Sequence, residues 1–171
     1  SGQSVLKALK RNSIDATGID PKTDNLEYLK LFDRIFICLH GKDGEDGKIQ
    51  KHLDILKIPY TGNGAAASSL CMNKYLAKKQ WAKDNVPTPL FMLANSSDDY
   101  TILKKYFGNV FILKPASSGS SLGVSIVKNN NDFMEAFDSA SRIDSTIIAE
   151  TYISGNEYAI PILNNAALPI I

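Results

Sequence analysis

The chain has 171 residues, of which 44% are hydrophobic and 22% charged, a composition typical of one globular domain or two small ones and not of a disordered chain. The formal net charge is +1, so no overall charge indicates nucleic acid or an anionic membrane as a partner. No apolar run approaches the roughly 18 residues of a membrane span, and no secretory signal pattern opens the chain.

The first third of the sequence predicts a small parallel α/β unit. Apolar residues at helical spacing predict a helix that ends near Asn12, and residues 14–19 alternate like a strand. The run 34–39 predicts a strand buried on both faces, with Cys38 as a small buried hydrophobe. A glycine-rich loop over 41–47 and a helix from Ile49 to Leu56 follow, so the loop lies at the carboxyl end of a strand.

The remaining two thirds predict an α+β domain. We expect helices over 70–83, 98–107 and 132–141, and strands over 90–93, 110–114, 123–127, 146–150 and 158–163. Closely spaced strands around a Gly/Ser loop indicate an antiparallel sheet with helices on one face. The segment 60–64 (YTGNG) is the expected boundary between an amino-terminal domain, 1–64, and a central domain, 65–171.

The segment from Lys114 to Gly123 is the first candidate site. A strand delivers Lys114 to a loop of small residues, which lets backbone amides approach an anion while the lysine adds positive charge. A flexible hairpin turn explains the same composition about equally well. The segment is not a Walker loop, because it lacks the Gly-Lys-Ser/Thr ending.

Two further segments combine charge with glycine. His40 to Gly47 places an imidazole and carboxylates directly after a predicted strand, although a structural turn with Asp46 as a helix cap is equally plausible. Glu150 to Glu157 offers carboxylates for an adenine amino group or ribose hydroxyls, although a solvated strand end is the simpler explanation.

A group of lysines and the two cysteines complete the candidates. Lys74 is followed by Lys78, Lys79 and Lys83, and for each lysine alone a solvated helix face is the stronger interpretation. Cys38 and Cys71 predict neither a disulfide framework nor a zinc site. The cytoplasm is therefore the expected compartment.

Together these segments resemble one family. HGKDGEDGKIQ, IPYTGNG, SLCMNK, PTP, FILKPASSGSSLGVS and IIAETYISGNEY occur in the order and approximate spacing of D-alanine–D-alanine ligases, which are ATP-grasp enzymes. Chance agreement of several ordered segments is far rarer than agreement of one, so the simpler explanations lose most of their weight. The resemblance implies a small α/β domain followed by an ATP-grasp central domain with an antiparallel sheet.

The resemblance also implies roles for single residues. Lys74 and Lys114 correspond to the lysines that hold the ATP phosphates. The phosphate loop corresponds to Ser117, Ser118, Gly119, Ser120 and Ser121, and Ser120 also orients the first D-alanine. Glu150 and the backbone of Tyr152 and Ile153 correspond to the adenine-contacting segment, and Glu157 to the ribose acceptor. His40 and Glu45 correspond to the pair that borders the first D-alanine.

The implied reaction transfers a phosphoryl group from ATP to one D-alanine, and the amine of a second D-alanine then attacks the acylphosphate to form the dipeptide used in peptidoglycan precursors. D-lactate or D-serine as the second substrate, or a non-catalytic nucleotide-binding module, remain open. The resemblance further implies a homodimer.

Departures from the family pattern concern mainly the two ends. The family's opening strand and glycine-rich loop should precede Ser1, and its magnesium ligands and C-terminal catalytic domain should follow Ile171. We therefore expect no metal ligand within the chain, weak nucleotide affinity and no turnover from these 171 residues alone. Asn73 stands where the family usually has aspartate, and Tyr152 where another aromatic residue is common.

Overall fold

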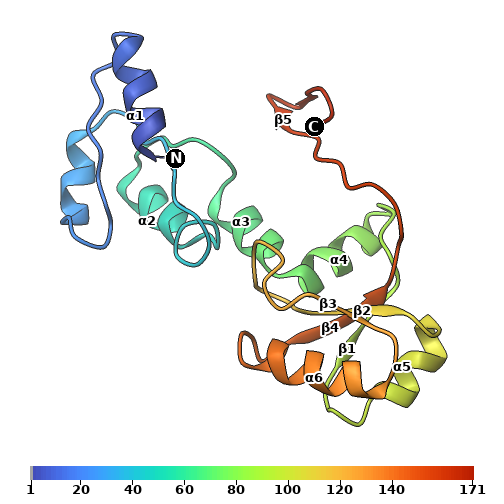
Figure 1. Cartoon of the computed structure of the whole chain (residues 1–171). Helices are drawn as coiled ribbons and strands as arrows, with labels where there is room; N and C mark the ends of the chain where they lie inside the picture. Colours follow the sequence, from blue (N-terminus) through green and yellow to red (C-terminus); the bar gives the residue numbers. More distant parts are fainter. Residues whose placement is uncertain (1) are drawn as a thin grey trace.

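The computed structural model describes residues 2–171, drawn as a ribbon in Figure 1. Its buried hydrophobic residues form two clusters. The helices are α1 (Gly2–Arg11), the 3-10 helix η1 (Leu26–Leu31), α2 (Lys48–Leu56), α3 (Ala65–Met72), α4 (Lys74–Lys83), α5 (Tyr100–Phe107) and α6 (Asn130–Ser141). The strands are β1 (Phe91–Ala94), β2 (Phe111–Pro115), β3 (Ser125–Val127), β4 (Ile147–Thr151), β5 (Ile162–Leu163) and β6 (Ala166–Ala167). Within the described part, no helix is long and apolar enough to cross a membrane.

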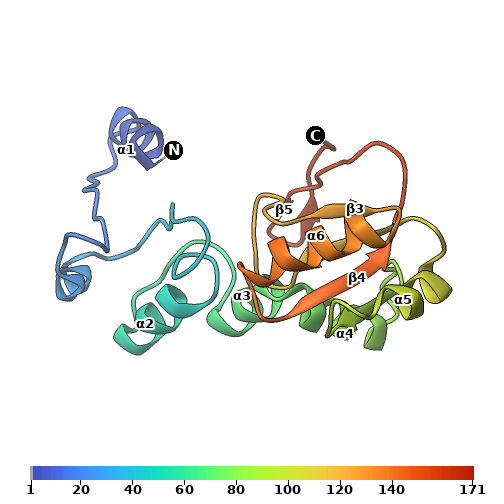
Figure 2. The ribbon, with the colours of Figure 1, turned by 60° about the horizontal axis from the view of Figure 1, so that its bottom comes forward.

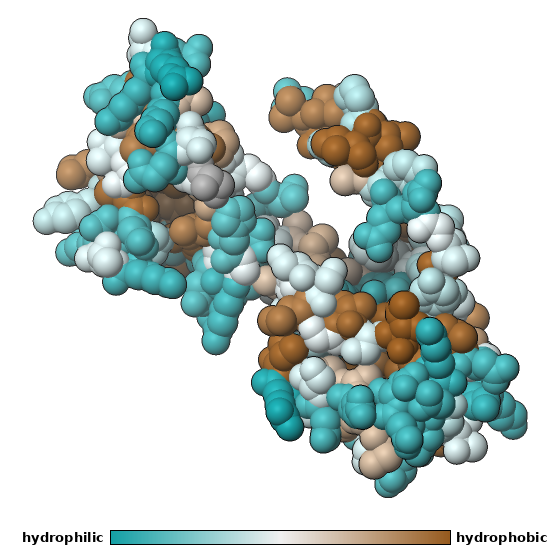
Figure 3. Space-filling model, in the orientation of Figure 1, coloured by the Kyte–Doolittle hydropathy of each residue, from teal (hydrophilic) through white to brown (hydrophobic). Residues whose placement is uncertain are grey.

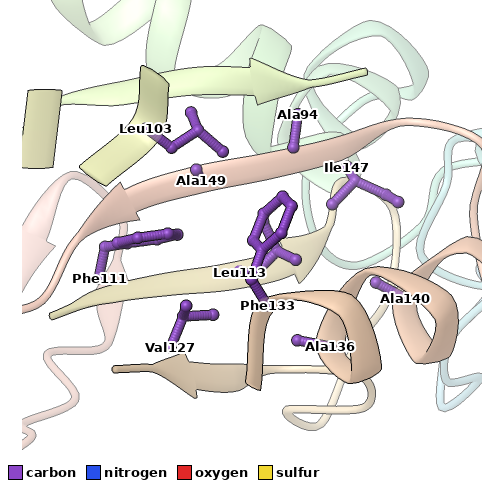
Figure 4. Packing of buried hydrophobic residues seen from close by; sticks show 10 residues of the cluster. All are labelled: Ala94, Leu103, Phe111, Leu113, Val127, Phe133, Ala136, Ala140, Ile147 and Ala149. Carbon is purple, nitrogen blue, oxygen red and sulfur yellow. The ribbon is translucent and has the colours of Figure 1, made fainter. Parts of the chain in front are cut away.

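The predicted antiparallel sheet is confirmed, with the strand order β1-β4-β2-β3. In the register of β2 and β4, Leu113 lies opposite Ala149, and both side chains point into one hydrophobic cluster (Figure 4). Because side chains alternate along a strand, Lys114 and Glu150 lie on the other face of the sheet. In Figure 1, α4 lies on that second face, whereas α5 and α6 cover the first.

An aromatic group forms the centre of the larger cluster. Phe111 and Phe133 are fully buried, and their ring centroids lie 6.2 Å apart. Tyr100, Phe107 and Phe137 pack around these two rings at centroid distances of 5.8–6.3 Å. Such tilted aromatic contacts add stabilisation beyond the apolar area they bury, so the sheet has a firm support beneath it.

The amino-terminal part packs around a smaller cluster and departs from the predicted strands. Its buried members are Leu29, Ile49, Leu53 and Ile58. The predicted strand over 14–19 is wrong, because within the described residues this segment belongs to no helix or strand and has no ladder partner. The predicted strand over 34–39 is reduced to one parallel bridge, Ile35 to Tyr60. A strand needs paired neighbours on its sides, and within residues 2–171 only the segment around Tyr60 forms a bridge with the backbone of this run.

The run 34–39 is also more exposed than predicted, because other elements cover it only in part. The side chain of Phe36 is 52% exposed and Cys38 is only partly buried, so the prediction of a strand buried on both faces, and of a buried Cys38, is wrong. Parallel strands become buried only when other elements cover both faces.

Two further elements differ from prediction. The helix expected over 70–83 is two helices, α3 and α4, because Asn73 leaves the helical conformation and caps α4 by accepting the amide of Leu76. The strand expected over 158–163 shrinks to β5, paired with β6. In Figure 1 this hairpin stands away from the four-stranded sheet, and Figure 3 shows brown, hydrophobic surface at this end of the chain. Ile160, just before the hairpin, and Ile162, within it, are both exposed.

The division into domains 1–64 and 65–171 stays a prediction. The two hydrophobic clusters fall on either side of residue 64. Figure 2 shows α3 between α2 and the sheet, and α3 contacts both α2 and α4. The helix that follows the expected boundary therefore links the two parts.

Candidate functional site

A buried carboxylate lies at the centre of the second face of the sheet. Glu150, on β4, is 8% exposed, and its Oε1 accepts a hydrogen bond from Lys114 Nζ at 2.8 Å. Antiparallel register makes this contact possible: Lys114 pairs with Ile148, two residues before Glu150, so the two charged side chains are diagonal neighbours. The sheet therefore holds a lysine and a glutamate together in a partly water-excluded place.

A second lysine reaches the same carboxylate from α4. Lys78 is 4% exposed, and its Nζ lies 2.9 Å from Glu150 Oε2. It also donates to Thr88 Oγ1 at 2.5 Å and to the carbonyl oxygen of Pro89 at 3.2 Å, and it lies 5.2 Å from the ring centroid of Phe91. The interpretation of Lys78 as part of a solvated basic face is therefore wrong, because its partners come from chain segments that helix periodicity does not reveal.

Lys74 is one helical turn before Lys78 and faces the loop Ser117–Ser121, the serine-rich loop. Its backbone amide donates to the carbonyl oxygen of Ala116 at 2.8 Å, and its ammonium donates to the carbonyl oxygens of Ala116 at 3.4 Å and of Ser118. Burial and, second, the nearby charge of Lys114 lower the pKa of Lys74, while Asp144 and Glu150 act in the opposite direction. This ammonium is therefore less well stabilised as a cation than an exposed lysine.

These groups converge on one cavity of about 290 Å³. It is lined by Cys71, Lys74, Ala77, Lys78, Trp81, Pro87, Thr88, Pro89, Lys114 and Glu150. A more open hollow of about 500 Å³ lies between β3 and α6, but none of the predicted site residues lines it. The cationic cavity between α4 and the sheet is therefore the candidate site, because predicted residues from three segments, Lys74, Lys114 and Glu150, line it.

The serine-rich loop adjoins this cavity through Lys74. Ser117 donates its amide to Asp144 Oδ2 at 2.8 Å, and Ser118 Oγ donates to the carbonyl oxygen of Leu122 at 2.9 Å. Ser120 and Ser121 adopt left-handed backbone conformations, with φ of 50° and 58°. Left-handed conformations are unfavourable for residues with a side chain, so this loop stores modest backbone strain near the lysines.

His40 and Glu45 form a separate, exposed pair. His40 Nδ1 lies 3.8 Å from Glu45 Oε1, and their side chains are 74% and 52% exposed. Glu45 Oε2 accepts the amide of Gly41 at 2.7 Å, so the glutamate orders its own loop. Gly47, not Asp46 as the sequence suggested, is the N-cap of α2, although Asp46 Oδ1 accepts the amide of Lys48 at 3.2 Å.

Of the predicted segment Glu150 to Glu157, only the first residue reaches the cavity. Glu150 lines it, whereas Tyr152, Ile153 and Glu157 follow β4 and are not among its lining residues. Tyr152 is 39% exposed and Ile153 67%, and Glu157 is also exposed.

Sequence reasoning missed Lys78 and Thr88. The only available signal was the four-residue spacing from Lys74 to Lys78, which places both on one helix face. Within residues 2–171, no group of three or more His, Cys, Asp or Glu side chains is placed to hold a metal ion.

Known proteins resemble the chain over nearly its whole length. Residues 2–63 match the family described as D-ala D-ala ligase N-terminus, and residues 88–171 match D-ala D-ala ligase C-terminus. D-alanine–D-alanine ligases of Dechloromonas aromatica and Halorhodospira halophila are 41% and 42% identical over all of this chain, which covers 57% and 56% of those proteins. The chain thus spans little more than half the length of the curated relatives it matches.

Solved structures of D-alanine–D-alanine ligases also resemble this chain over a little more than half of their own length. The fold matches the D-alanine–D-alanine ligase of Bacillus anthracis with a TM-score of 0.86 and 30% identity, over 98% of this chain and 56% of that one. The same enzyme solved in complex with ATP matches with a TM-score of 0.83, also at 30% identity, over 99% of this chain and 58% of that one.

Proposed function

Because the chain belongs to the D-alanine–D-alanine ligase family, we propose that it supplies the nucleotide-binding part of an ATP-dependent ligase. The observation that carries this proposal is the convergence of Lys74, Lys114 and Glu150 on one cavity beside a loop of small residues. The structure of an ATP complex of a related ligase supports it.

The two cavity lysines suit the binding of phosphate oxygens. Lys74 is engaged by loop carbonyls and Lys114 by a carboxylate, so both ammonium groups already lie in the cavity when the phosphates arrive. An ammonium that is only partly solvated interacts more strongly with a developing negative charge than one in water. The residues therefore neutralise charge and position the nucleotide, which is the main protein contribution to phosphoryl transfer.

We extend the proposal to the whole reaction, the joining of two D-alanines through an acylphosphate for peptidoglycan precursors. The remaining roles rest on motif positions. The loop Ser117–Ser121 closes over the phosphates, and Ser120, His40 and Glu45 border the first D-alanine. Glu150, Tyr152 and Ile153 contact adenine, and Glu157 contacts ribose.

Three further features belong to the same proposal. The chain divides into domains 1–64 and 65–171, the protein acts in the cytoplasm where ATP is available, and it forms a homodimer. The family implies magnesium, but the described residues do not fit a magnesium site, because no three His, Cys, Asp or Glu side chains among them are placed to hold a metal ion.

A fluorescence titration tests the nucleotide-binding proposal. Trp81, the one tryptophan in the sequence, lines the cavity, so its emission should change as ATP is added to the chain and should reach saturation. A chain that is folded by circular dichroism and shows no saturable change with ATP, in fluorescence or in calorimetry, contradicts the proposal.

The substrate proposal needs a second assay. The full-length gene product that contains this chain is incubated with ATP and magnesium, and phosphate release is measured with D-alanine, D-lactate or D-serine added. Release that requires D-alanine alone supports the ligation of two D-alanines. Release that requires D-alanine together with D-lactate or D-serine identifies a different second substrate.

A further inference from the structure

We propose that Lys78 is a positioning residue that holds the Glu150 carboxylate and so leaves Lys114 available for the nucleotide. The inference rests on the proposed function, because it concerns the same cavity. Lys78, Glu150 and Lys114 form a continuous line of charges, with one carboxylate oxygen facing each lysine at 2.9 Å and 2.8 Å.

The contacts of Lys78 show that it does not bind phosphate itself. An ammonium group has three protons, and three partners lie around this one: Glu150 Oε2, Thr88 Oγ1 and the carbonyl oxygen of Pro89. Its side chain is 5% exposed, compared with 17% for Lys114. Two hydrogen bonds and the ion pair with Glu150 therefore hold the ammonium of Lys78 inside the protein, and its effect on the nucleotide passes through Glu150.

The effect follows from charge balance. A buried carboxylate with one cation beside it pairs with that cation strongly, and phosphate must then compete for the same ammonium. With Lys78 present, the negative charge of Glu150 is shared between two cations, and the cavity keeps a net positive charge. Removing Lys78 should leave Lys114 as the sole neutralising partner and should weaken nucleotide binding.

A double-mutant cycle on ATP affinity tests this coupling, with the chain's ATP dissociation constant measured by Trp81 fluorescence. Lys78→Met in the otherwise unchanged chain should raise the dissociation constant about tenfold, or about 1.4 kcal/mol. In a Glu150→Gln background the same substitution should change it less than about twofold, because no carboxylate remains to be held. Lys78→Arg keeps the charge and should restore at least part of the affinity.

The control is Lys79→Met, the neighbouring exposed lysine, which lies over the ring of Tyr75 and should leave ATP affinity unchanged. If thermal unfolding shows that Lys78→Met does not fold, Lys78→Gln, which keeps donors for Thr88 and the Pro89 carbonyl, takes its place. A folded Lys78 variant with normal affinity, or an equal loss in the Glu150→Gln background, overturns this inference alone. A wild-type chain that binds no ATP overturns the proposed function and this inference with it.

Discussion

The lysine cavity and the His40–Glu45 loop differ in how their charged groups are held. The cavity joins Lys78, Lys114 and Glu150, which are 36 or more residues apart from one another in the chain and largely buried. The loop joins two residues five positions apart whose side chains are mostly exposed. Buried ion pairs with several partners keep a defined geometry, whereas exposed pairs contribute little and are screened by salt.

The same contrast extends to the parts that carry the two sites. An aromatic cluster with fully buried rings supports the sheet, whereas the amino-terminal cluster is smaller and lies beside an incomplete strand. Charged side chains keep the geometry that a ligand needs only when rigid elements support them. The charged groups of the cavity are therefore in place before the nucleotide binds. The geometry of the His40–Glu45 loop, in contrast, depends on what comes to contact it.

The strongest test of the comparison concerns the two clusters. Phe111→Ala should lower the free energy of unfolding by about 3–5 kcal/mol, because it empties the centre of the aromatic cluster. Leu29→Ala in the amino-terminal cluster should cost about 2 kcal/mol, because its surroundings are less enclosed. Urea unfolding measures both, and equal losses would mean that the two clusters are packed alike.

Lys114→Ala should weaken ATP binding about 100-fold, or about 2.7 kcal/mol, because it removes a cavity cation and leaves Glu150 with fewer partners. The dissociation constant from Trp81 fluorescence measures the loss. Lys105→Ala, at an exposed position on α5, is the control and should bind ATP normally. Unaltered binding by a folded Lys114→Ala variant would remove the phosphate role of this lysine.

Gly47→Ala should cost about 1–3 kcal/mol of stability and loosen the contact between α2 and α3. Gly47 has φ of +90°, and an added Cβ would lie 2.4 Å from the carbonyl oxygen of Ala65. Gly41→Ala is the matched control, because its φ is also positive but an added Cβ meets nothing within 4 Å. Thermal unfolding compares the two, and a smaller loss at Gly47 than at Gly41 would contradict the steric argument.

ATP affinity should fall as pH rises from neutral toward 10.5, the ordinary lysine pKa. The pKa of Lys74 is lowered, so Lys74 loses its proton, and with it the charge that attracts phosphate, at a lower pH than an ordinary lysine. The contribution of Lys74 to the free energy of unfolding should instead rise over the same pH range, because Lys74 binds its proton more tightly in the unfolded chain than in the folded one. Titrations at several pH values measure both, and Lys74→Met should show a shallower dependence of affinity.

The smallest effect is expected in the exposed pair. Glu45→Gln should change the free energy of unfolding by less than about 1 kcal/mol, because its pairing with His40 is solvated. ATP affinity of the chain should stay within about twofold. A large loss of ATP affinity would show that the loop and the cavity are coupled, and the contrast between them would then fail.

Local pattern alone predicted most of the elements, whereas the central part of the site was predicted from the resemblance of ordered motifs to a known family. The four strands of the sheet, with α5 and α6, lie within a few residues of their predicted positions because alternation and helical spacing are local properties. The ordered motifs pointed to Lys74, Lys114 and Glu150, and these three side chains do line one cavity.

Tertiary structure decided the features that depend on distant partners. Lys78 looked like a solvated lysine until Thr88, the Pro89 carbonyl and Glu150 enclosed it, and no spacing along α4 encodes those contacts. The run 34–39 had the composition of a buried strand, but composition does not supply the neighbouring backbone that a strand must pair with. Periodicity thus determines which face a side chain takes, whereas burial and charge pairing depend on what the fold places opposite that face.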